Sequence, residues 1–170
     1  KQRLALASCI MHKPRLLLLD EPTAGVDPKA RREFWNEIHH LAADGMTVLV
    51  STHYMDEAER CHRINYISYG RKLASGTVQE VVEGADLTTW VMAGKQAELS
   101  RATEQLQGMP GVRQVAPFGS DLHVVGHDVG ALKASVMQVA DEMSLKAEPG
   151  ETSLEDVFIQ FMADSTDNMA

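Results

Sequence analysis

The chain has 170 residues, of which 44% are hydrophobic and 24% are charged, a composition typical of a globular protein with one large domain or two small ones. It carries 24 acidic against 16 basic residues, which gives a formal net charge of -8. Because general binding to nucleic acids needs a basic surface that neutralises phosphates, this balance argues against a nucleic-acid partner.

The sequence contains two cysteines, Cys9 and Cys61. They show no metal-ligand spacing and are too few for a disulfide framework, so we expect two reduced, buried thiols of a cytosolic protein. There is no signal peptide and no run of about 18 apolar residues, so a role at a membrane would be peripheral. The first residue, Lys1, is not a methionine, which fits a fragment or a processed chain.

The first half of the chain alternates between predicted helices and predicted strands. We expect a helix over 1–12, a strand over 16–19, a helix over 28–41, a strand over 47–52, a short polar helix over 55–60, strands over 63–69 and 72–76, and a helical turn over 78–83. The leucine run at 16–19 lies between Pro14 and Pro22 and is typical of a strand buried on both faces of a parallel sheet. The segment 47–52 is predicted to be a second buried strand.

The pattern changes near residue 84, where we place a boundary between a domain of residues 1–84 and a domain of residues 85–170. The second domain is predicted to contain a strand over 87–92, a helix over 96–107, a hairpin of 112–117 and 122–125, a helix over 129–143, a helix over 153–162 with Ser153 as its N-cap, and a disordered tail after Ala163. This order indicates a small α+β domain with helices on one face of an antiparallel sheet. With about 80 residues it is near the lower limit for independent folding, so we expect it to dock against the first domain or a partner.

Two carboxylates, Asp20 and Glu21, stand at the carboxyl end of the leucine strand, within the segment LLLLDEPTAGVDP at 16–28. Open parallel sheets place their ligand chemistry at this edge. An aspartate there can hold Mg²⁺ against nucleotide phosphates, and a glutamate can orient a water for attack on the terminal phosphate. A simple turn cap is the alternative for the pair alone, and the residues that follow favour the phosphate chemistry.

One histidine of the seven, His53, follows the second buried strand directly. A histidine at this edge can reach the terminal phosphate of a nucleotide and respond to its hydrolysis. The alternative is a structural or solvent-exposed side chain. Asp27 stands just before Pro28, where it can act as the N-cap of the helix that follows.

The segment 16–28 resembles the Walker B motif and D-loop of the ATP-binding cassette (ABC) ATPases, and STHYMDEAE at 51–59 resembles the segment around their switch histidine. Residues 1–7 resemble the helix that follows their signature sequence. The resemblance implies an α/β fold, namely the C-terminal part of a P-loop NTPase (ABC ATPase) core, followed by a small α+β accessory domain. It implies ATP and Mg²⁺ as cofactors. The implied site residues are Asp20 at the metal, Glu21 and His53 in catalysis, and Ala24, Gly25 and Asp27 in the D-loop, which in the family crosses the dimer interface.

Motifs that lie upstream in the family do not occur in this sequence, including the glycine-rich phosphate loop and the signature turn. We therefore expect the chain alone to be inactive. SLEDVF at 153–158 resembles the closing motif of the accessory domain of type-2 (ABC-2) exporters. The resemblance implies an ATPase subunit, peripheral on the cytoplasmic face of the cell membrane, whose homodimer closes over two ATP molecules and drives ABC-2 type membrane permease subunits.

Two alternatives from other classes stay open. The chain could be a non-catalytic interaction module derived from an ABC ATPase. Its site residues would then be retained in their arrangement without catalysing turnover. It could also come from a soluble ABC ATPase that acts on ribosomes or DNA rather than in transport. The acidic balance and the segment 153–158 count against this last alternative.

Overall fold

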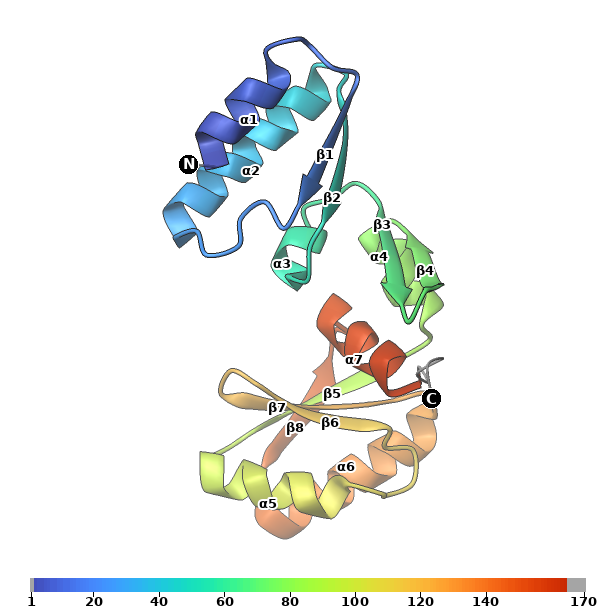
Figure 1. Ribbon diagram of the computed structural model, residues 1–170. Helices are drawn as coiled ribbons and strands as arrows, with labels where there is room; N and C mark the ends of the chain where they lie inside the picture. The colour runs from blue at the N-terminus through green and yellow to red at the C-terminus, as the bar shows by residue number, and fades with distance from the viewer. Residues whose placement is uncertain (1, 165–170) are drawn as a thin grey trace. The chain divides into compact units, whose positions relative to one another are not determined.

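The structure is a computed structural model that describes residues 2–164 (Figure 1). The chain divides into two compact units, residues 1–61 and residues 62–170. The predicted domain boundary at residues 84 and 85 lies inside the second unit. In that unit Tyr66 packs edge to face against Phe158 and stacks on Phe161, with ring centroids 4.3 and 5.8 Å apart. These aromatic contacts join the hairpin that precedes residue 84 to the last helix of the same unit.

The first unit pairs two parallel strands and covers one face of the pair with two helices (Figure 1). Its elements are α1 (Gln2–Ile10), β1 (Leu16–Asp20), α2 (Pro28–Ala43), β2 (Thr47–Ser51) and α3 (Met55–Ala58). The register sets Leu17 opposite Val48 and Asp20 opposite Ser51. The apolar core of this unit lies between the strand pair and the helices and contains Leu6, Leu17, Phe34, Trp35 and Ile38.

The prediction that the leucine strand is buried on both faces is wrong for the described structure. Leu17 is 4% exposed, whereas Leu16 and Leu18 on the opposite face are 52% and 65% exposed. The second strand is likewise open on that face, where Leu49 is 60% exposed. The reason is that the helices of this unit cover only one face, whereas a parallel sheet is ordinarily covered on both.

The second unit contains two hairpins and four helices within its described residues. Its elements are β3 (Ile64–Ser68), β4 (Arg71–Gly76), α4 (Val78–Gly84), β5 (Thr88–Ala93), α5 (Gln96–Leu106), β6 (Gln114–Phe118), β7 (Asp121–Gly126), α6 (Val129–Met143), β8 (Lys146–Gly150) and α7 (Leu154–Asp164). The predicted tail beyond Asp164 lies outside the described residues. Across residues 2–164, no helix combines the length and apolar character needed to cross a bilayer.

Strands β5 to β8 form one antiparallel sheet in the order β6-β7-β5-β8, a split β-α-β arrangement. Strand β8 was missed by the sequence analysis, because Lys146–Gly150 lacks β-branched residues and contains Pro149. The structure tolerates this proline because β8 is an edge strand.

The helices of this unit do not all lie on one face of the sheet, so that prediction is wrong. Helices α5 and α6 share a core with one face of β5 and β7, in which Met92, Leu122 and Val124 are at most 1% exposed. Helix α7 lies on the opposite face, where Asp156 contacts His123 of β7 (Figure 1). Both faces of the sheet are therefore covered by helices.

Helix α7 begins with a reciprocal cap. Ser153 donates its hydroxyl and its backbone N–H to Asp156 Oδ2, at 2.8 and 2.9 Å, and its Oγ accepts from the Asp156 N–H at 3.0 Å. His123 Nδ1 lies 3.3 Å from the same carboxylate, which is 1% exposed. The cap confirms Ser153 as the predicted N-cap residue.

The buried Asp156 carboxylate is expected to stabilise the second unit. Asp156→Ala should lower the free energy of unfolding by about 2 kcal/mol, because it removes the carboxylate half of the reciprocal cap and leaves the Ser153 and His123 donors unpaired. Urea titration measures the loss. The matched control is Glu155→Ala, an exposed residue of the same turn, for which a change within about 0.5 kcal/mol is expected. Equal losses in the two variants would contradict the role of Asp156.

Candidate functional site

The parallel register brings the polar ends of β1 and β2 together. Asp20 ends β1 and Ser51 ends β2, and the Ser51 hydroxyl donates to Asp20 Oδ1. The backbone N–H of Glu21 continues the pairing by donating to the Ser51 carbonyl at 2.9 Å. The Asp20 side chain is exposed, so one carboxylate is held in place at the sheet edge and remains accessible to a ligand.

Glu21 leaves the strand in a strained backbone conformation. Its φ of 43° lies in the left-handed region, which non-glycine residues rarely adopt. The following turn holds this conformation, since the Ala24 N–H donates to the Glu21 carbonyl at 3.1 Å. Glu21 Oε1 lies 3.1 Å from His53 Nδ1, and the two side chains are 50% and 59% exposed. The structure therefore brings together three of the predicted site residues, one of them the metal candidate.

The remaining predicted site residues lie on the loop between Glu21 and α2. Ala24 and Gly25 are exposed, and Gly25 has a φ of 68°, which suits a residue without Cβ. Asp27 caps α2, because its Oδ1 accepts from the backbone N–H groups of Lys29 and Ala30 at 3.1 and 3.0 Å. Its structural role as an N-cap is confirmed, whereas a role of this loop at a dimer interface stays a prediction.

One residue of this site, Glu57, was not singled out by the sequence analysis. Helix α3 was expected to be polar, yet Glu57 is fully buried. Its carboxylate accepts from the hydroxyls of Thr23 and Thr52, the second at 2.7 Å. Arg31 Nε lies 3.8 Å from Glu57 Oε1. In the sequence Glu57 stands between other charges, Asp56 and Glu59, and no spacing distinguishes the buried one.

The residues at the sheet edge fit a hydrated Mg²⁺ ion. Mg²⁺ usually keeps several waters and binds proteins through one or two carboxylates plus substrate phosphates. Within residues 2–164 there is no cluster of three or more metal-binding side chains. The exposed Asp20 carboxylate, oriented by Ser51, is the single ligand that such a site requires from this edge.

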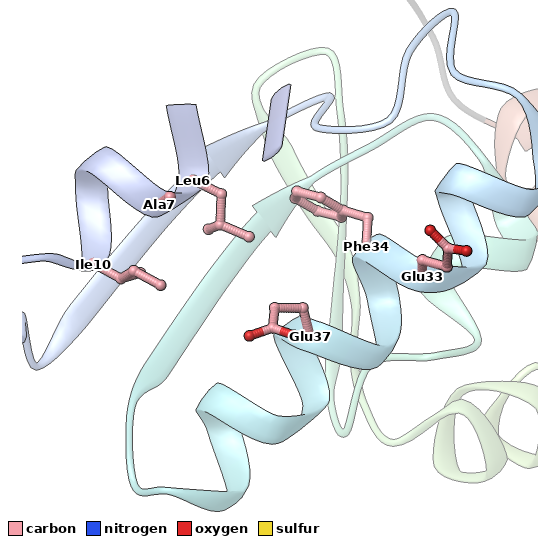
Figure 2. Close-up of a pocket in the computed structure, with 6 residues that line it drawn as sticks. All are labelled: Leu6, Ala7, Ile10, Glu33, Phe34 and Glu37. Atoms are coloured by element: carbon pink, nitrogen blue, oxygen red, sulfur yellow. The ribbon is translucent and has the colours of Figure 1, made fainter. Parts of the chain in front are cut away.

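The groove between α1 and α2 lies apart from these residues (Figure 2). It encloses about 340 Å³, and the side chains of Leu6 and Phe34 point toward each other across it. Ala7 and Ile10 extend its apolar wall, and two exposed glutamates of α2 line it as well. The groove holds no side chain from the carboxyl edge of the strands.

The chain is similar in sequence to the ATP-binding proteins of ABC transporters. It is 56% identical over 81 residues to the probable multidrug ABC transporter ATP-binding protein YbhF of Escherichia coli (strain K12), covering 48% of this chain and 14% of that protein. It is 35% identical over 164 residues to the Nod factor export ATP-binding protein I of Rhizobium sp. (strain N33), covering 94% of this chain and 51% of that protein.

A third relative is the Nod factor export ATP-binding protein I of Burkholderia pseudomallei (strain 1710b), 48% identical over 84 residues, which are 49% of this chain and 28% of that protein. No family model matches the chain. The chain spans about half the length, or less, of these relatives. Its mixed α/β structure is consistent with an ABC ATPase domain.

The two cysteines differ in their surroundings, contrary to the expectation that both are buried. Both are free thiols, but Cys9 is exposed and only Cys61 is partly buried. Burial, and then the nearby Glu57 charge, raise the pKa of the Cys61 thiol. A raised pKa leaves less thiolate at a given pH, which slows alkylation.

We therefore expect iodoacetamide at pH 8 to alkylate Cys9 severalfold faster than Cys61, with the Cys61 rate still rising as the pH is increased further. Mass spectrometry of the tryptic peptides measures both rates. The same reaction in 8 M urea is the control, because unfolding removes the difference in surroundings. Equal rates in the folded protein would contradict this assignment.

The Asp27 cap has a separate test. Asp27→Ala should lower the free energy of unfolding by about 1 kcal/mol, because two N–H groups of the first turn of α2 lose their acceptor. Asp27→Ser keeps a side-chain oxygen and should retain most of the stability. Thermal unfolding followed by circular dichroism compares the two variants. A loss in Asp27→Ser as large as that in Asp27→Ala would argue against a capping role.

Proposed function

We propose that the chain provides the Walker B, D-loop and switch-histidine part of the ATPase subunit of an ABC exporter. The observation that carries this proposal is the 3.1 Å contact of Glu21 with His53, next to Asp20 at one edge of the strand pair. A carboxylate base, a metal-binding carboxylate and a phosphate-sensing histidine are the side chains that phosphoryl transfer to water requires at such an edge.

Each of the three side chains has a proposed role in the hydrolysis of ATP. The Glu21 carboxylate accepts a hydrogen bond from the attacking water and orients it toward the terminal phosphate. His53 contacts the oxygens of that phosphate, and its Nδ1 is held by Glu21. Asp20 would hold Mg²⁺ through water, and the bound ion would neutralise charge on the phosphates.

The names of the relatives support export as the process that hydrolysis drives. They describe ATP-binding proteins of a probable multidrug transporter and of Nod factor export. By analogy, we propose that the intact protein works as a homodimer beside ABC-2 type membrane permease subunits, peripheral on the cytoplasmic face of the membrane. The exposed loop with Ala24 and Gly25 would meet the second ATPase subunit. The net charge of -8 argues against a nucleic-acid partner.

The role of Glu21 is tested in the full-length product of the gene. Glu21→Gln should lower the kcat for ATP hydrolysis by about 100-fold or more, because an amide cannot accept the proton of the attacking water. ATP binding should stay within about twofold, since the substitution keeps the shape of the side chain. Release of inorganic phosphate measures turnover, and equilibrium binding of a fluorescent ATP analogue measures affinity.

Glu37→Gln is the matched control, since Glu37 is an exposed glutamate on α2 and should tolerate the same change. The 170-residue chain alone should release no phosphate, because it contains no recognisable phosphate-cradling loop. Brisk turnover in Glu21→Gln would refute the role of Glu21. Absence of Mg²⁺-dependent turnover in the unsubstituted full-length protein would refute the proposed function itself.

A further inference from the structure

We propose that Glu57 is a positioning residue for ATP hydrolysis. Through hydrogen bonds to neighbouring residues, it fixes the position of Glu21 relative to His53. The inference rests on the proposed function and extends it to a fully buried residue. Glu57 is fully buried, and its two carboxylate oxygens accept from hydroxyls on two different segments.

The two threonines that donate to Glu57 adjoin the reacting side chains. Thr52 directly precedes His53, and its hydroxyl donates to Glu57 Oε2 at 2.7 Å. Thr23 follows Glu21 by two residues, is 1% exposed, and donates to Glu57 Oε1. A single carboxylate therefore ties the segment that carries the histidine to the turn that carries the glutamate.

Further contacts hold the segment that carries His53. The Thr52 oxygen also accepts from the backbone N–H of Tyr54 at 3.1 Å, so the residues on both sides of His53 are fixed. Arg31 adds a positive charge, with its Nε 3.8 Å from Glu57 Oε1 and its guanidinium 4.7 Å from the centre of the Tyr54 ring. A buried carboxylate with two hydroxyl donors and an adjacent guanidinium is compensated in charge and in hydrogen bonding.

The reacting side chains are only partly packed, with the His53 ring 4.1 Å from the ring of Tyr54 between their centroids. Glu21 and His53 are 50% and 59% exposed, so their mutual distance depends on the backbone segments that carry them. Displacements of about 1 Å in a catalytic group can cost about 100-fold in rate. Releasing either threonine from Glu57 should therefore lower kcat, whereas KM for ATP should change little because Glu57 is out of reach of the nucleotide.

The test compares kcat and KM of two variants of the full-length gene product, Thr52→Val and Thr52→Ser. Thr52→Val keeps the shape of the side chain and removes both the donor to Glu57 and the acceptor of the Tyr54 N–H. It should lower kcat by about 10- to 100-fold with KM for ATP within about twofold. Thr52→Ser restores the hydroxyl without the methyl and should recover most of the lost kcat. A purely structural role would instead lower the melting temperature in proportion to lost packing and leave the kcat of the folded enzyme unchanged.

A second pair of variants tests the carboxylate. Glu57→Gln should reproduce the loss of kcat, and Glu59→Gln, the same change at an exposed position, should not. If Glu57→Gln fails to fold, as judged by circular dichroism, Thr23→Val, which removes the other hydroxyl donor to Glu57, decides the question: a lowered kcat supports the role of Glu57 and an unchanged kcat overturns it. A kcat in Thr52→Val equal to that of the unsubstituted enzyme would overturn the role of Glu57 alone. Absence of turnover in the unsubstituted enzyme would overturn the proposed function, and the positioning role with it.

Discussion

The site depends on the parallel pairing of β1 with β2. The register sets Asp20 opposite Ser51, so the first residues beyond each strand leave the sheet at the same edge. Glu21 and His53 are 32 positions apart in the sequence, and this register is what brings them into contact. A slip of one residue would turn the side chains of one strand to the other face and separate the carboxylates from the histidine.

The loops beyond the strands convert this register into a defined arrangement of side chains. Glu21 is held at a positive φ by the turn that follows it, and Asp27 ends that turn by capping α2. Glu57 ties the same turn to the segment before His53. Strain at one residue is thus balanced by hydrogen bonds from several neighbours, a pattern common at functional sites.

Local chemistry in the sequence was sufficient to predict most elements. The amphipathic pattern led to bounds of 129–143 for α6, as observed. The sequence also indicated that Asp20, Glu21 and His53 lie at the carboxyl ends of two apolar strands, as observed, whereas their roles stay predictions. These features depend on residues within one turn or one strand, where spacing and capping are informative.

The features that could not be predicted depend on distant segments. Burial of Glu57 depends on Thr23, which is 34 positions away in the sequence. The open face of Leu16 and Leu18 depends on which elements cover the sheet, and the apolar run itself carries no information about that. Helix α7 packs on the face of the second sheet where Asp156 contacts His123. These two residues are far apart in the sequence, and no repeating pattern of residues predicts their contact.

The two edge strands of the second sheet share a feature with a consequence for assembly. Strands β6 and β8 lie at its two edges, and they contain Pro117 and Pro149 respectively. A proline has no N–H to donate, so each edge lacks a group that an added strand would need. Glu148 and Lys146, paired at 2.9 Å on β8, add charge at that edge. The sheet is thereby protected from growing by strand addition at these two edges.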